Sequence, residues 1–128
     1  MPNKIAPISI PKNEPILGYL SGSTERATLK SELERRKLNV QDIPMFIDGK
    51  EVRTNITIDI FPPHELTHKI AQYHVGNSIY VEQAIDAALQ ARTKWANMHW
   101  EDRAAIFLKA ADLIADPYRA SINAATML

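Results

Sequence analysis

The sequence predicts an α+β chain in which a small antiparallel sheet, within about residues 45–75, is flanked by α-helices. Three observations support this fold class. Two short apolar arms surround Asp48-Gly49, a dipeptide that strongly indicates a tight β-hairpin. Residues 55–61, NITIDIF, alternate apolar and polar side chains as a half-buried strand does. From residue 81 onward, apolar residues recur with the 3.6-residue period of a helix.

The composition is that of an ordinary globular protein, and it excludes several classes of function. The 128 residues are 45% hydrophobic and 23% charged, which suits one domain with a core. Fifteen basic residues balance fifteen acidic ones, so no net charge attracts nucleic acid or an anionic membrane. The chain has no cysteine, which excludes disulfides and thiol nucleophiles within it. No apolar run approaches the ~20 residues of a membrane span, and no leader-peptide pattern opens the chain, so the predicted location is the cytoplasm.

The N-terminal third is predicted to be an extended arm followed by a surface helix. Four prolines interrupt residues 1–23, which favours an extended conformation. Ser23 can cap a helix over about residues 24–37, where charged residues outnumber apolar ones. The basic end of this helix, residues 35–37, lies where the helix dipole favours cations. A solvated helix end is the favoured interpretation of that cluster, and phosphate binding is the alternative.

The middle of the chain is predicted to be β-rich. The hairpin occupies residues 45–52, MFIDGKEV, and the alternating segment 55–61 follows it. A turn at Pro62-Pro63 leads to a further strand over residues 68–75, HKIAQYHV.

Three helices are predicted in the C-terminal half. Asn77 or Ser78 can cap the first, over about residues 78–96, and a short break precedes the second, over about residues 101–115. Asp116-Pro117 is expected to start the third, over residues 117–128, with Asp as the cap and Pro at the first helical position. This last helix has no glycine or polar cap, which leads us to expect that the domain is truncated here. The first two helices are expected to bury one face each: Val81, Ala84, Ile85, Ala88, Ala91 or Arg92, Trp95, Ala104, Phe107, Leu108, Ala111 and Ile114.

The segment PPHELTH contains His64-Glu65-x-x-His68, the spacing with which many zinc peptidases hold their metal. That chemistry requires a helix, which points both imidazoles to one side and lets the Glu activate a metal-bound water. Here two prolines precede the first His and strands flank the segment, and in an extended chain the two His would lie ~13 Å apart. A polar turn is therefore predicted, and a zinc peptidase is a remote alternative. The other side chains considered as a third ligand lack a known zincin spacing: His74, Glu82 and His99.

Other catalytic patterns are missing from the sequence. The four glycines fit neither a dinucleotide-binding nor a P-loop spacing, and no serine has a nucleophile-elbow context. Trp95 and Trp100 frame the break between two helices, where packing is a better interpretation than a ligand cage. The sequence therefore predicts no catalytic, cofactor-binding or metal-ligating residue.

Several segments resemble the aldehyde dehydrogenase superfamily. Residues 81–114, VEQAIDAALQARTKWANMHWEDRAAIFLKAADLI, resemble its N-terminal helical pair, in which an Ala-rich helix ends in Trp and a second helix carries Arg and KAADL. MFIDGKEV resembles the first hairpin of the family. Residues 13–33, NEPILGYLSGSTERATLKSEL, narrow the resemblance to the branch that oxidises L-glutamate γ-semialdehyde. The resemblance covers residues 13–128 in collinear order.

This resemblance implies an α/β fold in which residues 24–128 form the N-terminal part of an NAD-binding domain, before its Rossmann sheet and the catalytic domain. It implies that the longer enzyme uses NAD to oxidise L-glutamate γ-semialdehyde to L-glutamate in proline catabolism. The family's thiol nucleophile has no counterpart here, so this chain alone is expected to be inactive. The implied partners are the small-molecule substrate of the whole enzyme and the remainder of the dehydrogenase or a homologous subunit.

The resemblance also implies a homo-oligomer, without nucleic acid or membrane partners. Family members are mitochondrial in eukaryotes, so the mitochondrial matrix is the alternative location. A non-catalytic interaction module that keeps the same helices is the alternative function. In either case the apolar helix faces are expected to lack a partner within this chain, which predicts marginal stability and aggregation.

Overall fold

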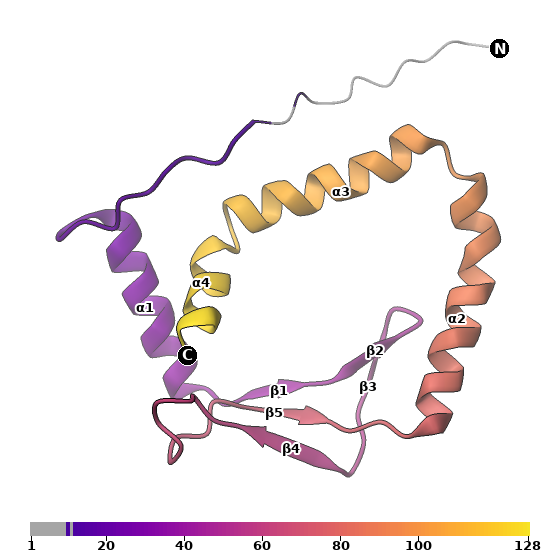
Figure 1. Cartoon of the computed structure of the whole chain (residues 1–128), viewed down its shortest axis with the longest axis horizontal. Coiled ribbons are helices and arrows are strands. Elements are labelled where there is room, and N and C mark those ends of the chain that lie inside the picture. The colour runs from indigo at the N-terminus through magenta and orange to yellow at the C-terminus, as the bar shows by residue number, and fades with distance from the viewer. Residues whose placement is uncertain (1–9, 11) are drawn as a thin grey trace.

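The computed structural model describes residue 10 and residues 12–128, and it shows helices and short strands arranged around an open frame (Figure 1). The predicted α+β class is confirmed. Residues 1–9 and 11 of the predicted arm lie outside the described part of the chain. The elements, in chain order, are α1 (Thr24–Leu38), β1 (Gln41–Ile43), β2 (Met45–Ile47), β3 (Lys50–Val52), β4 (Thr57–Ile60), β5 (Ala71–His74), α2 (Ser78–Asn97), α3 (Trp100–Ala115) and α4 (Arg119–Met127).

The strands form two small sheets, whereas the sequence predicted a single antiparallel sheet. β2 and β3 form the predicted hairpin around Asp48 and Gly49, whose φ angles of 54° and 70° suit the tight turn. In the other sheet β5 is central, antiparallel to β4 and parallel to β1. β1 was not predicted, because three residues are too few to display an alternating pattern.

Both predicted helix caps form. The Ser23 hydroxyl accepts a hydrogen bond from the Arg26 backbone N–H at 3.4 Å, at the start of α1. The Asn77 side-chain oxygen accepts one from the Ile79 N–H at 3.0 Å, at the start of α2. Each cap pairs one of the N–H groups that a helix start leaves free.

The start of α4 corrects the predicted boundary. This helix begins at Arg119 and not at residue 117, and Asp116 does not cap it. The Asp116 N–H instead donates to the Asp112 carbonyl at 3.2 Å, which closes the end of α3. The Tyr118 N–H donates to the Leu113 carbonyl at 2.9 Å, so a separate turn joins the two helices.

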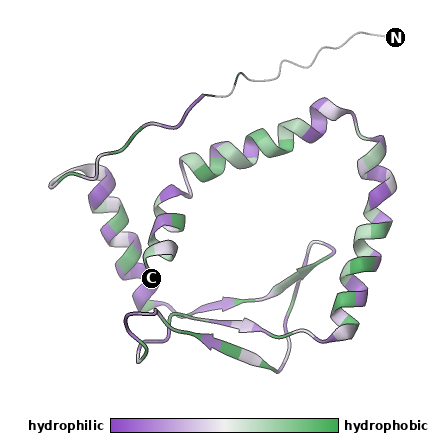
Figure 2. Ribbon diagram, viewed as in Figure 1, coloured by the Kyte–Doolittle hydropathy of each residue, from purple (hydrophilic) through white to green (hydrophobic). Residues whose placement is uncertain are grey.

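Very little of the chain is enclosed. The buried hydrophobic residues of the described part are Ala71 in β5 and Ala124 in α4, and α2 and α3 contain no buried residue. Hydrophobic residues nevertheless recur along both of these helices (Figure 2). The main partner of α2 within the chain is β2, and that of α3 is α4. Among the described helices, none has the length and apolar character needed to cross a membrane.

Candidate functional site

The segment with zinc-peptidase spacing forms two successive turns and no helix, as predicted. The Glu65 N–H donates to the Pro62 carbonyl at 3.0 Å, and the His68 N–H donates to the Glu65 carbonyl at 3.1 Å. Glu65 also pairs with the Lys37 ammonium at 3.1 Å, a hydrogen bond that lowers the pKa of this carboxyl. The His68 Nε2 atom lies 2.8 Å from the Lys37 carbonyl oxygen. Glu65 and His68 therefore attach the turn to the end of α1, and His64 is exposed.

The other candidate ligands lie on separate elements. His74 belongs to β5, Glu82 lies on the exposed surface of α2, and His99 precedes α3. Over residues 12–128, no group of three His, Cys, Asp or Glu side chains is placed to hold a metal ion.

Zinc binding provides a simple test of this interpretation. Purified protein equilibrated with zinc and then passed through a desalting column is expected to retain less than one equivalent, because no three potential ligands are grouped within residues 12–128. His64→Ala is expected to leave the retained amount unchanged, as is His99→Ala, the matched change of an exposed histidine elsewhere. The measurement is elemental analysis of the eluted protein. One equivalent of zinc that only His64→Ala removes would contradict the prediction.

A polar network joins β1, β5 and the residues after β3. The Asp42 carboxylate accepts hydrogen bonds from Arg53 at 2.8 Å and Gln72 at 3.1 Å, and it lies 3.0 Å from the His74 Nε2 atom. On the other side of the ring, His74 Nδ1 lies 2.9 Å from the Thr54 backbone nitrogen and 2.8 Å from the Thr54 carbonyl oxygen. The hydrogen bond from Arg53 is the largest cause that lowers the pKa of Asp42 to about 2. His74 therefore serves to hold strands together.

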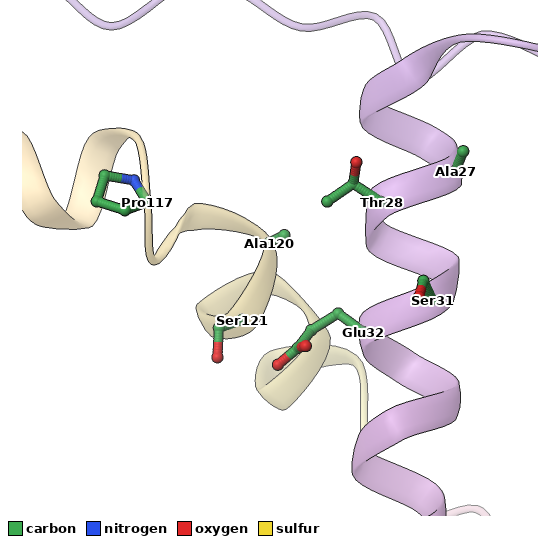
Figure 3. Close-up of a pocket in the computed structure, with 7 residues that line it drawn as sticks. All are labelled: Ala27, Thr28, Ser31, Glu32, Pro117, Ala120 and Ser121. Atoms are coloured by element: carbon green, nitrogen blue, oxygen red, sulfur yellow. The ribbon is translucent and has the colours of Figure 1, made fainter.

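Arg36, in the basic end of α1, binds α4, which corrects the prediction of a solvated helix end for this residue, whereas the Arg35 side chain stays 51% exposed. Arg36 donates to the Ser121 hydroxyl at 2.5 Å and to the Glu32 carboxylate at 3.1 Å, and Arg35 donates twice to Glu32 at 2.7 Å. The Arg35 hydrogen bond is the largest cause that lowers the pKa of Glu32 to about 2. Beside this bridge, the two helices border a cavity of about 450 Å³ (Figure 3), lined by Ala27, Thr28, Ser31, Glu32, Pro117, Ala120 and Ser121.

The most extensive candidate interaction surface consists of the apolar faces of α2 and α3. The structure leaves these faces largely uncovered, as predicted, because five of the six large residues expected to face inward are 40% to 66% exposed, whereas the sixth, Leu108, is half-buried. Apolar surface of this extent is typical of a contact site for another part of a protein. The five exposed residues are Val81, Ile85, Trp95, Phe107 and Ile114.

The face of α2 continues into a groove of about 610 Å³ beside the β2–β3 hairpin. Gly76 permits this close approach, because a Cβ atom there would lie 2.8 Å from the Met45 sulfur. The groove is almost wholly apolar, which suits a hydrophobic side chain better than a charged ligand. Its lining residues are Met45, Ile47, Gly76, Asn77, Tyr80, Val81, Ala84, Ile85 and Ala88.

Comparisons with known proteins agree with the resemblance seen in the sequence. Delta-1-pyrroline-5-carboxylate dehydrogenase of Agaricus bisporus is 45% identical over 126 residues, which are 98% of this chain and 22% of that protein. The mitochondrial delta-1-pyrroline-5-carboxylate dehydrogenase of Mus musculus is 39% identical over 116 residues, which are 91% of this chain and 21% of that protein. The chain thus spans about a fifth of the length of these curated relatives.

A solved structure has the same arrangement of elements. The Mycobacterium tuberculosis delta-pyrroline-5-carboxylate dehydrogenase bound with NAD and cobalamin superposes with a TM-score of 0.91 at 34% identity, covering 100% of this chain and 24% of that one. The predicted fold is therefore confirmed. Residues 50–127 also match the model described as the aldehyde dehydrogenase family. That match extends over more than half of the sequence, and we conclude that the chain belongs to the aldehyde dehydrogenase family.

Proposed function

We propose that this chain is the N-terminal segment of an NAD-dependent dehydrogenase that oxidises L-glutamate γ-semialdehyde, the open form of 1-pyrroline-5-carboxylate, to L-glutamate in proline catabolism. The observation that carries the proposal is the 45% identity to the Agaricus bisporus relative across 98% of this chain. NAD is the proposed cofactor of the longer enzyme, and the NAD-bound structure of the Mycobacterium tuberculosis protein supports it.

Within that enzyme, residues 24–128 are proposed to be the first part of the NAD-binding domain. Their role is structural, because the sequence supplies no cysteine for a thiol nucleophile and no phosphate-binding glycine pattern. In this proposal the apolar faces of α2 and α3 are covered by the remainder of the dehydrogenase. Burying such surface stabilises a protein by about 25 cal/mol for each Å² removed from water.

The proposed partners follow from the same assignment. They are the small-molecule substrate of the whole enzyme and the remainder of the dehydrogenase, in an enzyme that we expect to be a homo-oligomer. The Mus musculus relative is described as mitochondrial, which supports the mitochondrial alternative to the predicted cytoplasmic location.

A second candidate function is a non-catalytic module that binds a whole dehydrogenase subunit of the same family. The exposure of Val81, Phe107 and Ile114 favours it, because the same faces could pack on a separate chain. The two candidates differ in whether this sequence can take the place of the N-terminal segment in an active enzyme.

The test is a fusion protein in which this chain replaces the matched segment of the Agaricus bisporus relative. The fusion protein is expected to form NADH from 1-pyrroline-5-carboxylate, because the apolar faces of this chain would pack as the relative's own segment does. The 128-residue chain alone, and the relative without its matched segment, are the inactive controls. A soluble, folded fusion protein without activity would contradict the proposal. A stable complex between the separate chain and the intact relative would then support the second candidate.

A further inference from the structure

The corner between α2 and α3 contains an arginine that forms no ion pair with the described residues. Arg103 lies in the first turns of α3, and its Nε atom is enclosed yet makes no hydrogen bond with the described residues. An enclosed guanidinium nitrogen without an acceptor destabilises the fold, so a hydrogen-bond acceptor for Arg103 is missing from the described residues.

The aromatic pair Trp95 and Phe107 lies beside this arginine on the exposed apolar surface. The Arg103 guanidinium carbon lies 6.0 Å from the centre of the Trp95 ring, and Trp95 meets Phe107 edge to face at 6.4 Å between ring centres. Trp95 and Phe107 remain 40% and 66% exposed. Because the rings exclude water from one side of the guanidinium, they strengthen its attraction for an anion that approaches from the other side.

The position of Arg103 in its helix adds to this argument. The N-terminal end of α3 carries the positive end of the helix dipole, which favours the acidic residues Glu101 and Asp102 and opposes a nearby guanidinium. If an apolar surface alone covered the corner, the charge would lose its remaining contact with water without gaining a partner. The covering surface must therefore bring a negative group to this point.

We infer that Arg103 is the charged anchor of the α2–α3 surface, and that it binds an aspartate or glutamate side chain presented by the remainder of the longer enzyme. This inference rests on the proposed function. The surface is apolar around one guanidinium, so its complement is an apolar surface that carries one carboxylate, which arginine can bind through two parallel hydrogen bonds. The matched relatives contain nearly four-fifths of their length outside the aligned segment, which is ample chain to provide that surface.

Carbodiimide coupling in the fusion protein tests this pairing directly. Arg103→Lys places a primary amine at the anchor, and the carbodiimide joins an amine to a carboxylate that touches it, forming an amide with loss of water. Digestion and mass spectrometry are expected to find the introduced amine linked to an acidic residue of the relative's portion of the same chain. The control is the native Lys109, an amine on an exposed position of α3 that is not part of the apolar faces.

Each other result of the coupling would overturn the inference. A link only to Glu101 or Asp102 would show that α3 supplies its own partner, and a link between two subunits would assign the corner to a second copy. A variant in which position 103 forms no more links than the native Lys109 would show that no carboxylate contacts the anchor.

A second measurement covers the case in which Arg103→Lys fails to fold. Arg103→Met keeps a side chain that can pack on Trp95 but removes the charge. It is expected to lower the Tm of the fusion protein by roughly 5 °C or more, because an acidic partner would then be buried alone. Lys109→Met, which removes a charge from an exposed position of α3, is expected to leave the Tm almost unchanged. Equal Tm values for the two variants would overturn the inference. An inactive but folded fusion protein would instead contradict the proposed function, so the two failures are distinguishable.

Discussion

The purified 128-residue chain is expected to unfold gradually on heating, without a single cooperative transition, and to associate in solution. Its accessible surface is 10492 Å², whereas a compact monomer of this size exposes ~6,800 Å². The described part buries only two hydrophobic residues, Ala71 and Ala124, so its elements share no hydrophobic core. Without a shared core, the elements are expected to unfold separately on heating. The exposed faces of α2 and α3 provide the surface through which chains would associate.

Circular dichroism during heating, fluorescence of a dye that binds apolar surface, and size-exclusion chromatography measure these properties together. The expected results are a broad loss of helical signal, strong dye fluorescence and a mixture of sizes. The fusion protein is the control, and it should melt sharply without binding the dye. A sharp melt of a monodisperse 128-residue chain would contradict this prediction and would show that the chain is a stable unit by itself.

Local sequence patterns were sufficient to predict most elements of the fold. The hairpin at Asp48-Gly49, the caps Ser23 and Asn77, and the long helices all depend on interactions between residues a few positions apart. The parallel pairing of β1 with β5 depends on residues about thirty positions apart, and so does the use of Glu65 and His68 to bind the end of α1. Such contacts leave no periodic signal in the sequence.

The candidate surface could be predicted only in part, for a related reason. The 3.6-residue period identified the apolar faces around Val81 and Phe107, because burial imposes that period whichever surface covers them. The roles of Arg36 and Arg103 depend on where α4 and Trp95 lie in space. A charged residue in a helix has the same appearance in a sequence whether it is solvated, paired or enclosed without a partner.

In the fusion protein, Ala124→Asp is expected to lower the Tm more than any other single change on α4. Ala124 is fully enclosed, with 0% of its surface exposed, and α4 packs against α1. A carboxylate placed there finds no room and no partner, and an unpaired buried polar group costs several kcal/mol, on the order of 3 to 5. α4 is the main packing partner of α1 among the described elements, so the attachment of α1 depends strongly on this contact.

The matched control for this substitution is Thr126→Asp, which introduces the same side chain on an exposed position of the same helix. Both changes place an aspartate near the C-terminal end of α4, where its charge is unfavourable, so the difference between them isolates the effect of burial. Thermal melting and limited proteolysis measure that difference, and cleavage before Thr24 or within α1 should increase only in Ala124→Asp. Equal losses in the two variants would contradict the argument, because they would show that α1 does not depend on the enclosed position. A loss confined to Ala124→Asp would establish that α1 is held by packing on α4.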